Sequence, residues 1–394
     1  MNAGEPERWD VAGAVVLWLA TATVVVLLLP LGLHPDDVGV MQFVSQHGYG
    51  DVWTTPFMRL FYRPLVVTIA KLGTDLFGPG ALPLRVLQGA LVSAIILSFV
   101  GLLRESAGRF ARSAGGLCLL ASPLVFVTVT PFAVGVADTI VLLSFLIAVR
   151  LALVQQGSEP GTLWSFIGLS IVAVLAKESG VLVVAFCVAE SVRRRAWAAS
   201  TALLALGGAY LAVRSSFVHV QPYGFKTGFL LGMYGPRELR SMFGESPYLF
   251  YLYNVACNLS SALFYIPVKG QLRVSLRIAV VAVVVTATSL VAMRQLVRSG
   301  EYRRWMPLLG VLFLNAVLGY LYVRARIMFV GYAVIAIFFV RAMDDLWKRP
   351  QQLLGLSGRS IAVTLWLSWI GLWVAVIVRL RLQAAAALDA TIAS

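Results

Sequence analysis

Acidic and basic residues that could carry chemistry stand between long apolar segments of this chain. Two neighbouring carboxylates, Asp36 and Asp37, follow the first apolar run. A third, Asp138, lies inside another apolar stretch, and Lys177 and Glu178 stand side by side between two more. A carboxylate can take a proton from an attacking hydroxyl group, and cations can stabilise the charge on a leaving phosphate. These residue types therefore suit a site that handles a phosphorylated substrate.

Each of these charges also has a structural explanation. Asp36 and Asp37 could supply an N-cap and a first-turn acid for the helix that follows them. Asp138 could cap a helix in the same way, and Lys177 with Glu178 could form an ion pair that reaches toward the membrane surface. Asp36 and Asp37 could also hold a divalent cation such as Mg²⁺ or Mn²⁺, which the sequence leaves open. No other cofactor is predicted.

The composition of the chain indicates where these residues lie. Of its 394 residues, 59% are hydrophobic and 13% are charged, and the mean hydropathy is +0.85. Soluble domains are about 45–50% apolar and about 25% charged. We therefore expect an all-α, polytopic transmembrane helical bundle, with a single transmembrane domain over residues 1–394 and membrane lipids around it. The net charge of +14 would suggest nucleic acid in a soluble protein, but here we expect no nucleic-acid partner.

Apolar segments long enough to cross a bilayer recur along the chain. We expect about eleven spans, because a helical span needs about 20 residues. They are placed at 11–33, 83–103, 114–131, 134–153, 162–176, 181–192, 197–213, 275–297, 306–322, 327–343 and 361–379. Basic clusters follow every second span, beginning near Arg104, Arg193, Arg294 and Arg341. Because such clusters stay in the cytoplasm, the N-terminus is expected on the cytoplasmic side.

Two long segments are expected on the opposite, extracytoplasmic side. The first loop, 34–82, should contain amphipathic helices that lie in the interface, one of them with Pro64 in its first turn. The second, 214–274, is rich in aromatic residues, which could form an interfacial belt or a stacking surface for a glycan.

Some expected spans are too short to cross the bilayer. Segments 162–176 and 181–192 flank Lys177 and Glu178, and at about 1.5 Å per residue each falls short of a hydrocarbon layer of about 30 Å. The turn between them should therefore lie below the outer surface, in a cavity. Charges at that depth cost about 2.5–3.5 kcal/mol each, so they need partners or water.

Ten polar residues are expected to meet on the outer face. They are Asp36, Asp37, Arg59, Arg63, Lys71, Asp138, Lys177, Glu178, Arg324 and Arg326. Their charge and place give Arg324 and Arg326 a role in phosphate binding, and Glu178, Arg59 and Lys71 a supporting role.

The order of these motifs resembles that of a known family. A span is followed by the acid pair, by a Phe61–Leu65 segment that opens a short helix, by Asp138 at the start of a span, and by Lys177 and Glu178. In this order, over residues 10–195, the chain is similar to the GT-C superfamily of membrane glycosyltransferases. Within it, the chain looks closest to the protein O-mannosyltransferase and lipid A aminoarabinose transferase branch.

The resemblance implies a reaction and a role for several residues. An inverting transferase of this kind moves a sugar from a polyprenyl-phosphate donor to a hydroxyl of a glycan, lipid or protein acceptor, outside the cytoplasm. Asp36 or Asp37 would act as the base or orient the acceptor, and Asp138 would be the second carboxylate. Arg63 and Lys177 would lie near the donor phosphate.

Two other functions fit the same residues. The first is a transporter or flippase for a lipid-linked sugar, which should need charged residues on both sides of the membrane midplane. Here the buried ionisable residues are expected on the outer side. The second is a glycan polymerase or ligase with a lipid-diphosphate donor. The arginine- and alanine-rich, lysine-poor composition is typical of a GC-rich bacterium, which makes the inner membrane the expected location.

Overall fold

The computed structural model describes most of the chain. It covers residues 5–32, 35–56, 62–104, 107–120, 132–154, 160–217, 302–319, 328–348 and 356–368, with scattered positions in 252–259, 352–353 and 370–382. Its elements, in chain order, are α1 (Glu5–Leu28), α2 (Pro35–Gln46), α3 (Tyr49–Thr54), α4 (Pro64–Phe77), α5 (Ala81–Leu102), α6 (Arg109–Leu120), α8 (Phe132–Val154), α9 (Pro160–Ala176), the 3₁₀ turn η1 (Glu178–Gly180), α10 (Val181–Arg193), α11 (Trp197–Phe217), α15 (Tyr302–Leu318), α16 (Phe329–Lys348), β1 (Gln352–Leu353) and β2 (Leu356–Ser357).

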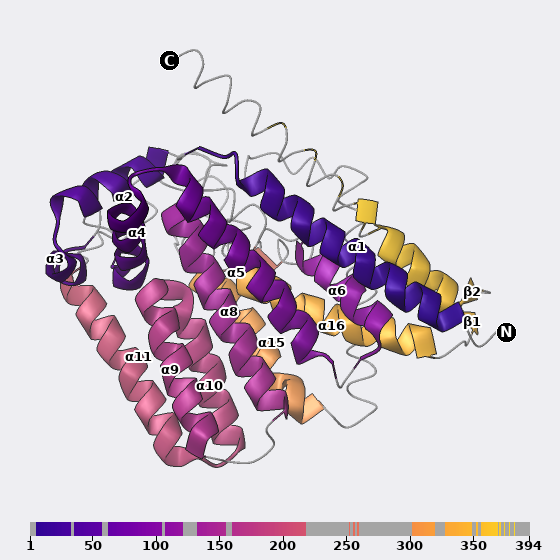
Figure 1. The fold of residues 1–394 in the computed structure, drawn as a ribbon. Helices are drawn as coiled ribbons and strands as arrows, with labels where there is room; N and C mark the ends of the chain where they lie inside the picture. Colours follow the sequence, from indigo (N-terminus) through magenta and orange to yellow (C-terminus); the bar gives the residue numbers. More distant parts are fainter. Residues whose placement is uncertain are drawn as a thin grey trace, which may run out of the picture.

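The described residues are helical almost throughout, which confirms the predicted class (Figure 1). The strands β1 and β2 are two residues long and form one short antiparallel pair. Within the described residues, three segments are long and apolar enough to cross a membrane, namely Asp10–Leu28, Ala81–Leu102 and Gly135–Leu153. The described part of the chain is therefore helical, with three candidate membrane-spanning helices.

The expected number of spans stays a prediction. The apolar segments Gly161–Ala176 and Trp305–Leu318 are shorter than a full span, as expected for the helix before Lys177. The expected span 275–297 and most of the expected loop 214–274 lie outside the described residues.

The long helices share one end that is rich in basic residues. There the N–H of Gly108 donates to Asp344 of α16 (2.7 Å), just before α6 begins. The end of α5 lies beside the end of α8, and Arg194 donates to the carbonyl of Ala152 (3.0 Å), which joins the end of α10 to the same place. We call this the basic end. Its basic residues include Arg104, Arg109, Arg150, Arg193, Arg194 and Lys348.

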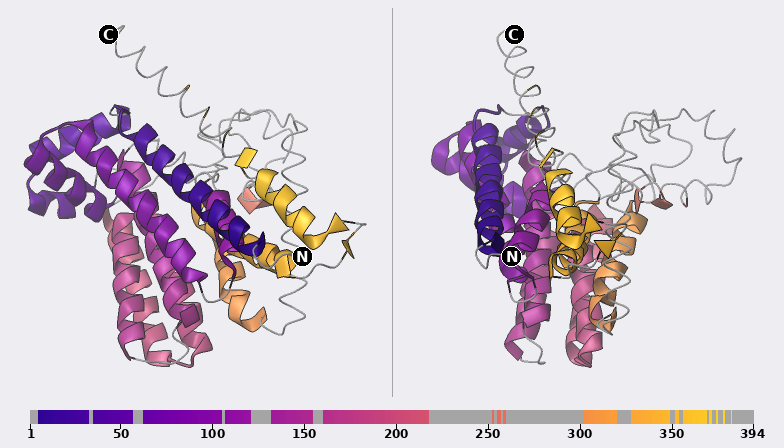
Figure 2. Two further views of the ribbon diagram at one scale, coloured as in Figure 1. Left: turned by 45° about the vertical axis from the view of Figure 1, so that its right-hand side comes forward. Right: turned by 90° about the vertical axis from the view of Figure 1, so that its right-hand side faces the viewer.

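Three short helices cover the opposite end, which we call the capped end. Helix α2 packs on α4 and α8, α3 packs on α4, and α4 packs on α5, α8 and α9. Figures 1 and 2 show α2, α3 and α4 gathered together, away from the N-terminus of α1. The helix predicted at Pro64 is confirmed, since α4 begins there with proline in its first turn. The expected loop 34–82 is therefore largely helical.

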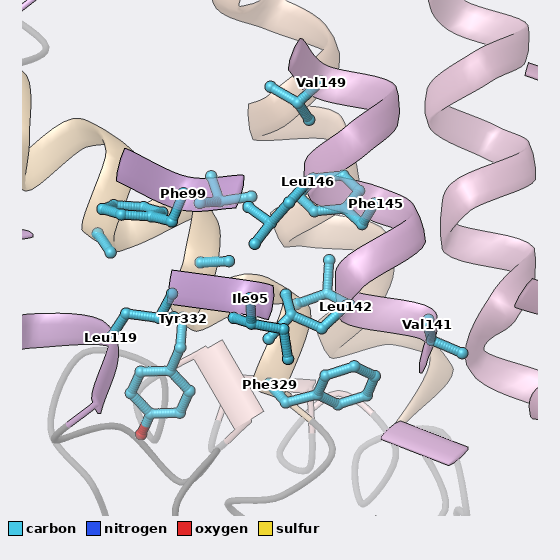
Figure 3. Close-up of a cluster of buried hydrophobic side chains, with 14 of the residues drawn as sticks. Ile95, Phe99, Leu119, Val141, Leu142, Phe145, Leu146, Val149, Phe329 and Tyr332 are labelled. Atoms are coloured by element: carbon cyan, nitrogen blue, oxygen red, sulfur yellow. The ribbon is translucent and has the colours of Figure 1, made fainter. Parts of the chain in front are cut away.

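The core lies where α5, α8 and α16 meet. Figure 3 shows its side chains interdigitating between these helices. They include Ile95, Phe99, Leu142, Phe145, Leu146 and Phe329, all at most 1% exposed. This core holds the N-terminal half of α8 in a fixed position beneath the capped end.

Helix α6 fits between α1 and α16 because two of its residues lack side chains. A Cβ atom on Gly115 would overlap the side chain of Val340 in α16 and crowd Phe99. One on Gly116 would lie 2.8 Å from Leu17 of α1. Glycine at both positions lets the three helices approach closely, as small residues commonly do between membrane helices.

Replacing Gly115 with alanine should destabilise the protein. The added methyl group overpacks a closed interface, a change that costs about 1–3 kcal/mol. The thermal unfolding midpoint of purified protein in one detergent should fall for Gly115→Ala. The matched control is Gly168→Ala in α9, where a Cβ atom meets nothing within 4 Å. Equal midpoints for the two variants would contradict this packing.

Candidate functional site

The turn between α9 and α10 positions two charged residues at the capped end. Helix α9 ends at Ala176, Lys177 is extended, and the 3₁₀ turn η1 leads directly into α10. A Cβ atom on Gly180 would overlap the backbone of Ala173, so the turn can approach α9 only with glycine there. The N–H of Gly180 donates to the carbonyl of Lys177 (2.8 Å). Lys177 and Glu178 therefore project from a rigid backbone.

Lys177 forms an ion pair with Asp138 of α8. Asp138 is fully buried, and the lysine side chain is 13% exposed. The lysine ammonium also lies 5.8 Å from the centre of the Phe329 ring. Burial lowers the pKa of Lys177 and the charge of Asp138 opposes this, with a net pKa below the ordinary value. Each charge of this pair compensates the other, and a buried charge is tolerated only when it has such a partner.

Glu178, the next residue, pairs with Arg63 at the start of α4. The guanidinium donates two hydrogen bonds, from Nη2 to Oε1 (2.8 Å) and from Nε to Oε2 (3.2 Å). Burial alone would raise the pKa of Glu178, but the charge and hydrogen bonds of Arg63 outweigh it and hold that pKa below its usual range. This bidentate geometry is the strongest form of an arginine–carboxylate pair.

A third buried ion pair joins Asp37 of α2 to Arg85 of α5. Nη2 of Arg85 lies 3.8 Å from Oδ2 of Asp37, and both side chains are at most 2% exposed. The guanidinium also donates to Gln88 (2.7 Å) and to the carbonyl of Gly32 (2.7 Å). Arg85 therefore links the end of the first span to α2 and α5.

Lys71 joins the capping helices to one another. Its ammonium lies 3.4 Å from Asp75 and donates to the carbonyl of Val44 in α2 (3.2 Å). The hydroxyl of Tyr49 in α3 donates to the same aspartate (2.9 Å). Lys71 and Asp75 therefore join α2, α3 and α4, and the predicted support of the site by Lys71 stays a prediction.

The described site residues meet at the capped end. Helices α2 and α4 and the turn η1 all pack against α8, which carries Asp138. The structure thus brings together Arg63, Asp138, Lys177 and Glu178 at one turn, and it places Asp37 at the same end in a separate pair with Arg85, so five of the residues predicted from sequence lie at the capped end. The predicted residues Arg59, Arg324 and Arg326 lie outside the described residues, as does the side chain of Asp36. Their roles, and those of the described five, stay predictions.

Buried ionisable residues also occur at the basic end, where we did not expect them. Glu190 of α10 is 2% exposed and pairs with Arg194 (2.8 Å), whose side chain is 3% exposed, and with Arg193 (2.6 Å). The described residues therefore carry buried ionisable groups at both ends of the molecule, whereas we expected them to cluster on one side. Glu190 and Arg194 are adjacent on α10, four residues apart, so the helix can satisfy both charges by itself.

The described residues contain no group of three or more histidine, cysteine or acidic residues that could hold a metal ion. The described carboxylate of the acid pair, Asp37, lies against an arginine. A divalent cation at Asp36 and Asp37 stays a prediction.

Two residues of this end were missed from sequence. Arg85 lies near the start of an apolar segment, where a basic side chain usually reaches the lipid headgroups. The sequence therefore does not indicate that it is buried beside Asp37. Tyr210, near the end of α11, packs against Tyr62, the residue before Arg63. An aromatic residue near a span end usually belongs to the interfacial belt.

Comparison of the chain with protein-family models, curated proteins and solved structures finds no match. The resemblance to the GT-C superfamily is therefore carried by the motifs of this sequence alone.

Breaking one partner of the Lys177–Asp138 pair should destabilise the protein more than removing both. A single change leaves a buried charge without compensation, which costs about 3–5 kcal/mol. We expect Lys177→Met and Asp138→Asn each to lower the thermal midpoint, and the double variant to lower it by less than either single change. Arg104→Met serves as control, since Arg104 is exposed at the basic end. Strict additivity would show that the pair is not coupled.

Proposed function

We propose that this protein is an inverting glycosyltransferase that moves a sugar from a polyprenyl-phosphate donor to an acceptor hydroxyl. One observation supports this function above others. Lys177 and Arg63 present two buried cations at a single turn, each held in place by a carboxylate from another part of the chain. Such a pair of fixed cations suits a phosphate group, whose oxygens accept charge-assisted hydrogen bonds.

Donor binding would exchange the partners of these cations. The phosphate brings its own negative charge to Lys177 and Arg63, so the ion pairs with Asp138 and Glu178 can open without leaving a cation uncompensated. Asp138 then loses its lysine partner when the donor is in place, and its buried negative charge is removed when it accepts a proton. For this reason we assign Asp138 the role of general base, which accepts the proton of the acceptor hydroxyl. The first-loop acids Asp36 and Asp37 would orient the acceptor.

The chemical step balances with these groups. The acceptor oxygen attacks the anomeric carbon from the face opposite the phosphate, and its proton passes to the carboxylate of Asp138. The bond from the anomeric carbon to the phosphate oxygen breaks, and the electron pair leaves with the polyprenyl phosphate. Lys177 and Arg63 stabilise the leaving group, because their charges are fixed where the negative charge develops.

An apolar groove suits the lipid part of such a donor. It lies between α10 and α15, has a volume of about 480 Å³, and is lined by apolar residues such as Ala185, Val311 and Leu314, with Arg193 of the basic end at its border. Helix α10 begins at the turn that carries Lys177 and Glu178 and runs toward the basic end, so a lipid chain that leaves the phosphate could follow this helix into the groove.

The two ends of the molecule suggest its orientation. Clusters of arginine and lysine mark the cytoplasmic side of membrane proteins, and the basic end carries them here. The capped end would then face away from the cytoplasm, across the inner membrane of a bacterium. The acceptor would be a glycan, lipid or protein that reaches this side.

Transport of a lipid-linked sugar is the second candidate. It is favoured by the buried Glu190–Arg194 pair, which places ionisable groups at the basic end as well. A transporter would bind the same lipid but leave the sugar attached to it.

Turnover of labelled donors separates these functions. Purified protein is given a panel of radiolabelled polyprenyl-phosphate sugars, and release or transfer of the sugar is measured. Asp138→Asn should lower turnover by about 10²- to 10⁴-fold, the usual contribution of a general base. Its donor affinity should be retained or increased, because Lys177 loses a competing partner. Lys177→Met should instead weaken donor binding.

Asp51→Asn is the matched control. Asp51 lies on α3 at the same end, is exposed, and caps a backbone N–H that asparagine can also cap. Its turnover should equal that of the unchanged protein. A donor that binds wild type and all variants equally, with no sugar released, would contradict the enzyme and favour transport.

A further inference from the structure

A second group of polar side chains lies beside the Arg63–Glu178 pair. Helix α11 ends at the capped end and carries Tyr210 and Arg214, one helical turn apart. Tyr210 packs with Tyr62, Val174 and Val184 in a small cluster separate from the main core. Tyr62, which shares this cluster, directly precedes Arg63 in the chain, so the cluster lies next to the Arg63–Glu178 pair.

Three polar atoms of this group are buried without a hydrogen-bond partner in the described part of the chain. They are the hydroxyl of Tyr210, the hydroxyl of Ser179 and Nε of Arg214. Tyr210 is 6% exposed, so its hydroxyl group does not exchange the missing hydrogen bond for one to bulk water. Folded proteins satisfy nearly all buried polar groups, and the exceptions call for a specific explanation. A ligand that supplies the partners is such an explanation.

Tyr62, in the same cluster, has a hydrogen bond at its hydroxyl group. Its ring packs beside that of Tyr210, but its hydroxyl donates to the carbonyl of Trp53 (3.3 Å). The two tyrosines therefore share an apolar environment and differ in whether a protein group satisfies the hydroxyl.

The chemistry of these atoms favours a sugar. Hydroxyl groups of tyrosine and serine both donate and accept, and sugar hydroxyls do the same. A phosphate only accepts and would lie against the cations Lys177 and Arg63, and a polyprenyl tail can satisfy no hydrogen bond. Ser179 follows Glu178, the partner of Arg63, and Tyr210 belongs to the same cluster as Tyr62, the residue before Arg63. Both hydroxyl groups therefore belong to segments next to the Arg63–Glu178 pair.

We infer that Tyr210 and Ser179 form the part of the site that binds the hydroxyl groups of the donor sugar, with Arg214 at its edge. This inference rests on the proposed function and extends it, because it places the sugar of the donor on α11 and the turn η1. Tyr210 is a positioning and specificity-determining residue in this arrangement. It takes no part in proton transfer.

Binding of two lipids, with and without the sugar, tests this role. The probes are the polyprenyl-phosphate sugar of the panel that wild type binds most tightly and the same polyprenyl phosphate without a sugar. Dissociation constants are measured for wild type, Tyr210→Phe and the control Tyr62→Phe. Both variants keep the ring and remove one hydroxyl.

The ratio of the two dissociation constants is the decisive quantity. Wild type should bind the sugar-bearing lipid more tightly, and Tyr210→Phe should reduce that preference by about tenfold, the effect of one good hydrogen bond in a dry site. Its affinity for the bare lipid should not change. Tyr62→Phe should keep the wild-type preference.

Three outcomes would overturn the inference in distinguishable ways. If Tyr210→Phe keeps the wild-type preference, the sugar lies elsewhere while the proposed function stands. If it weakens both lipids equally, Tyr210 supports the ion pair and does not contact the sugar. If wild type binds neither lipid, the proposed function fails and the inference fails with it.

Discussion

The capped end depends on the need to keep buried charges paired. Lys177 and Glu178 are adjacent and opposite in charge, and each meets its counterpart from a different element, Asp138 of α8 and Arg63 at the start of α4. Asp138 is fully buried and Arg63 nearly so, and a charge left alone in such a place is costly, so neither contact opens readily without a substitute. The turn η1 therefore fixes α4 and α8 relative to α9. Gly180 makes this possible, because the turn could not lie so close to α9 with any side chain at that position.

The same constraint links stability to the proposed chemistry. A group that brings its own negative charge can replace the carboxylates at Lys177 and Arg63, whereas water or a neutral ligand cannot do so at low cost. The site is then rigid before the donor binds and selective for an anionic one. Fixed cations of this kind need no reorganisation when charge develops on the leaving group. The Asp37–Arg85 pair adds a second fixed point by joining α2 to α5.

Sequence patterns predicted the elements better than the partners. Hydropathy alone identified the membrane-crossing helices, and Pro64 marked the start of α4 because proline suits the first turn of a helix. The short apolar segments around Lys177 correctly indicated charged residues that need partners. Arg63 and Glu178 are 115 residues apart, however, and no local pattern specifies that pairing.

Other residues escaped prediction because a simpler explanation fits their sequence position. Arg85 and Tyr210 both stand near the ends of apolar segments, where basic and aromatic side chains commonly reach the membrane surface. In the fold, Arg85 pairs with Asp37 of α2, and Tyr210 packs with Val174 of α9 and Val184 of α10, so both side chains are buried. Arg194 belongs to a basic cluster that the sequence predicts on the cytoplasmic side. In the fold it is buried with Glu190 where the end of α10 contacts α8.

The most direct test of this account is an experimental structure of the protein in a lipid nanodisc with polyprenyl phosphate bound. We predict that phosphate oxygens lie within hydrogen-bond distance of Lys177 Nζ and of the Arg63 guanidinium, and that the Lys177–Asp138 pair has opened. A phosphate bound elsewhere, with both ion pairs of the turn intact, would contradict the exchange of partners on which the proposed mechanism depends.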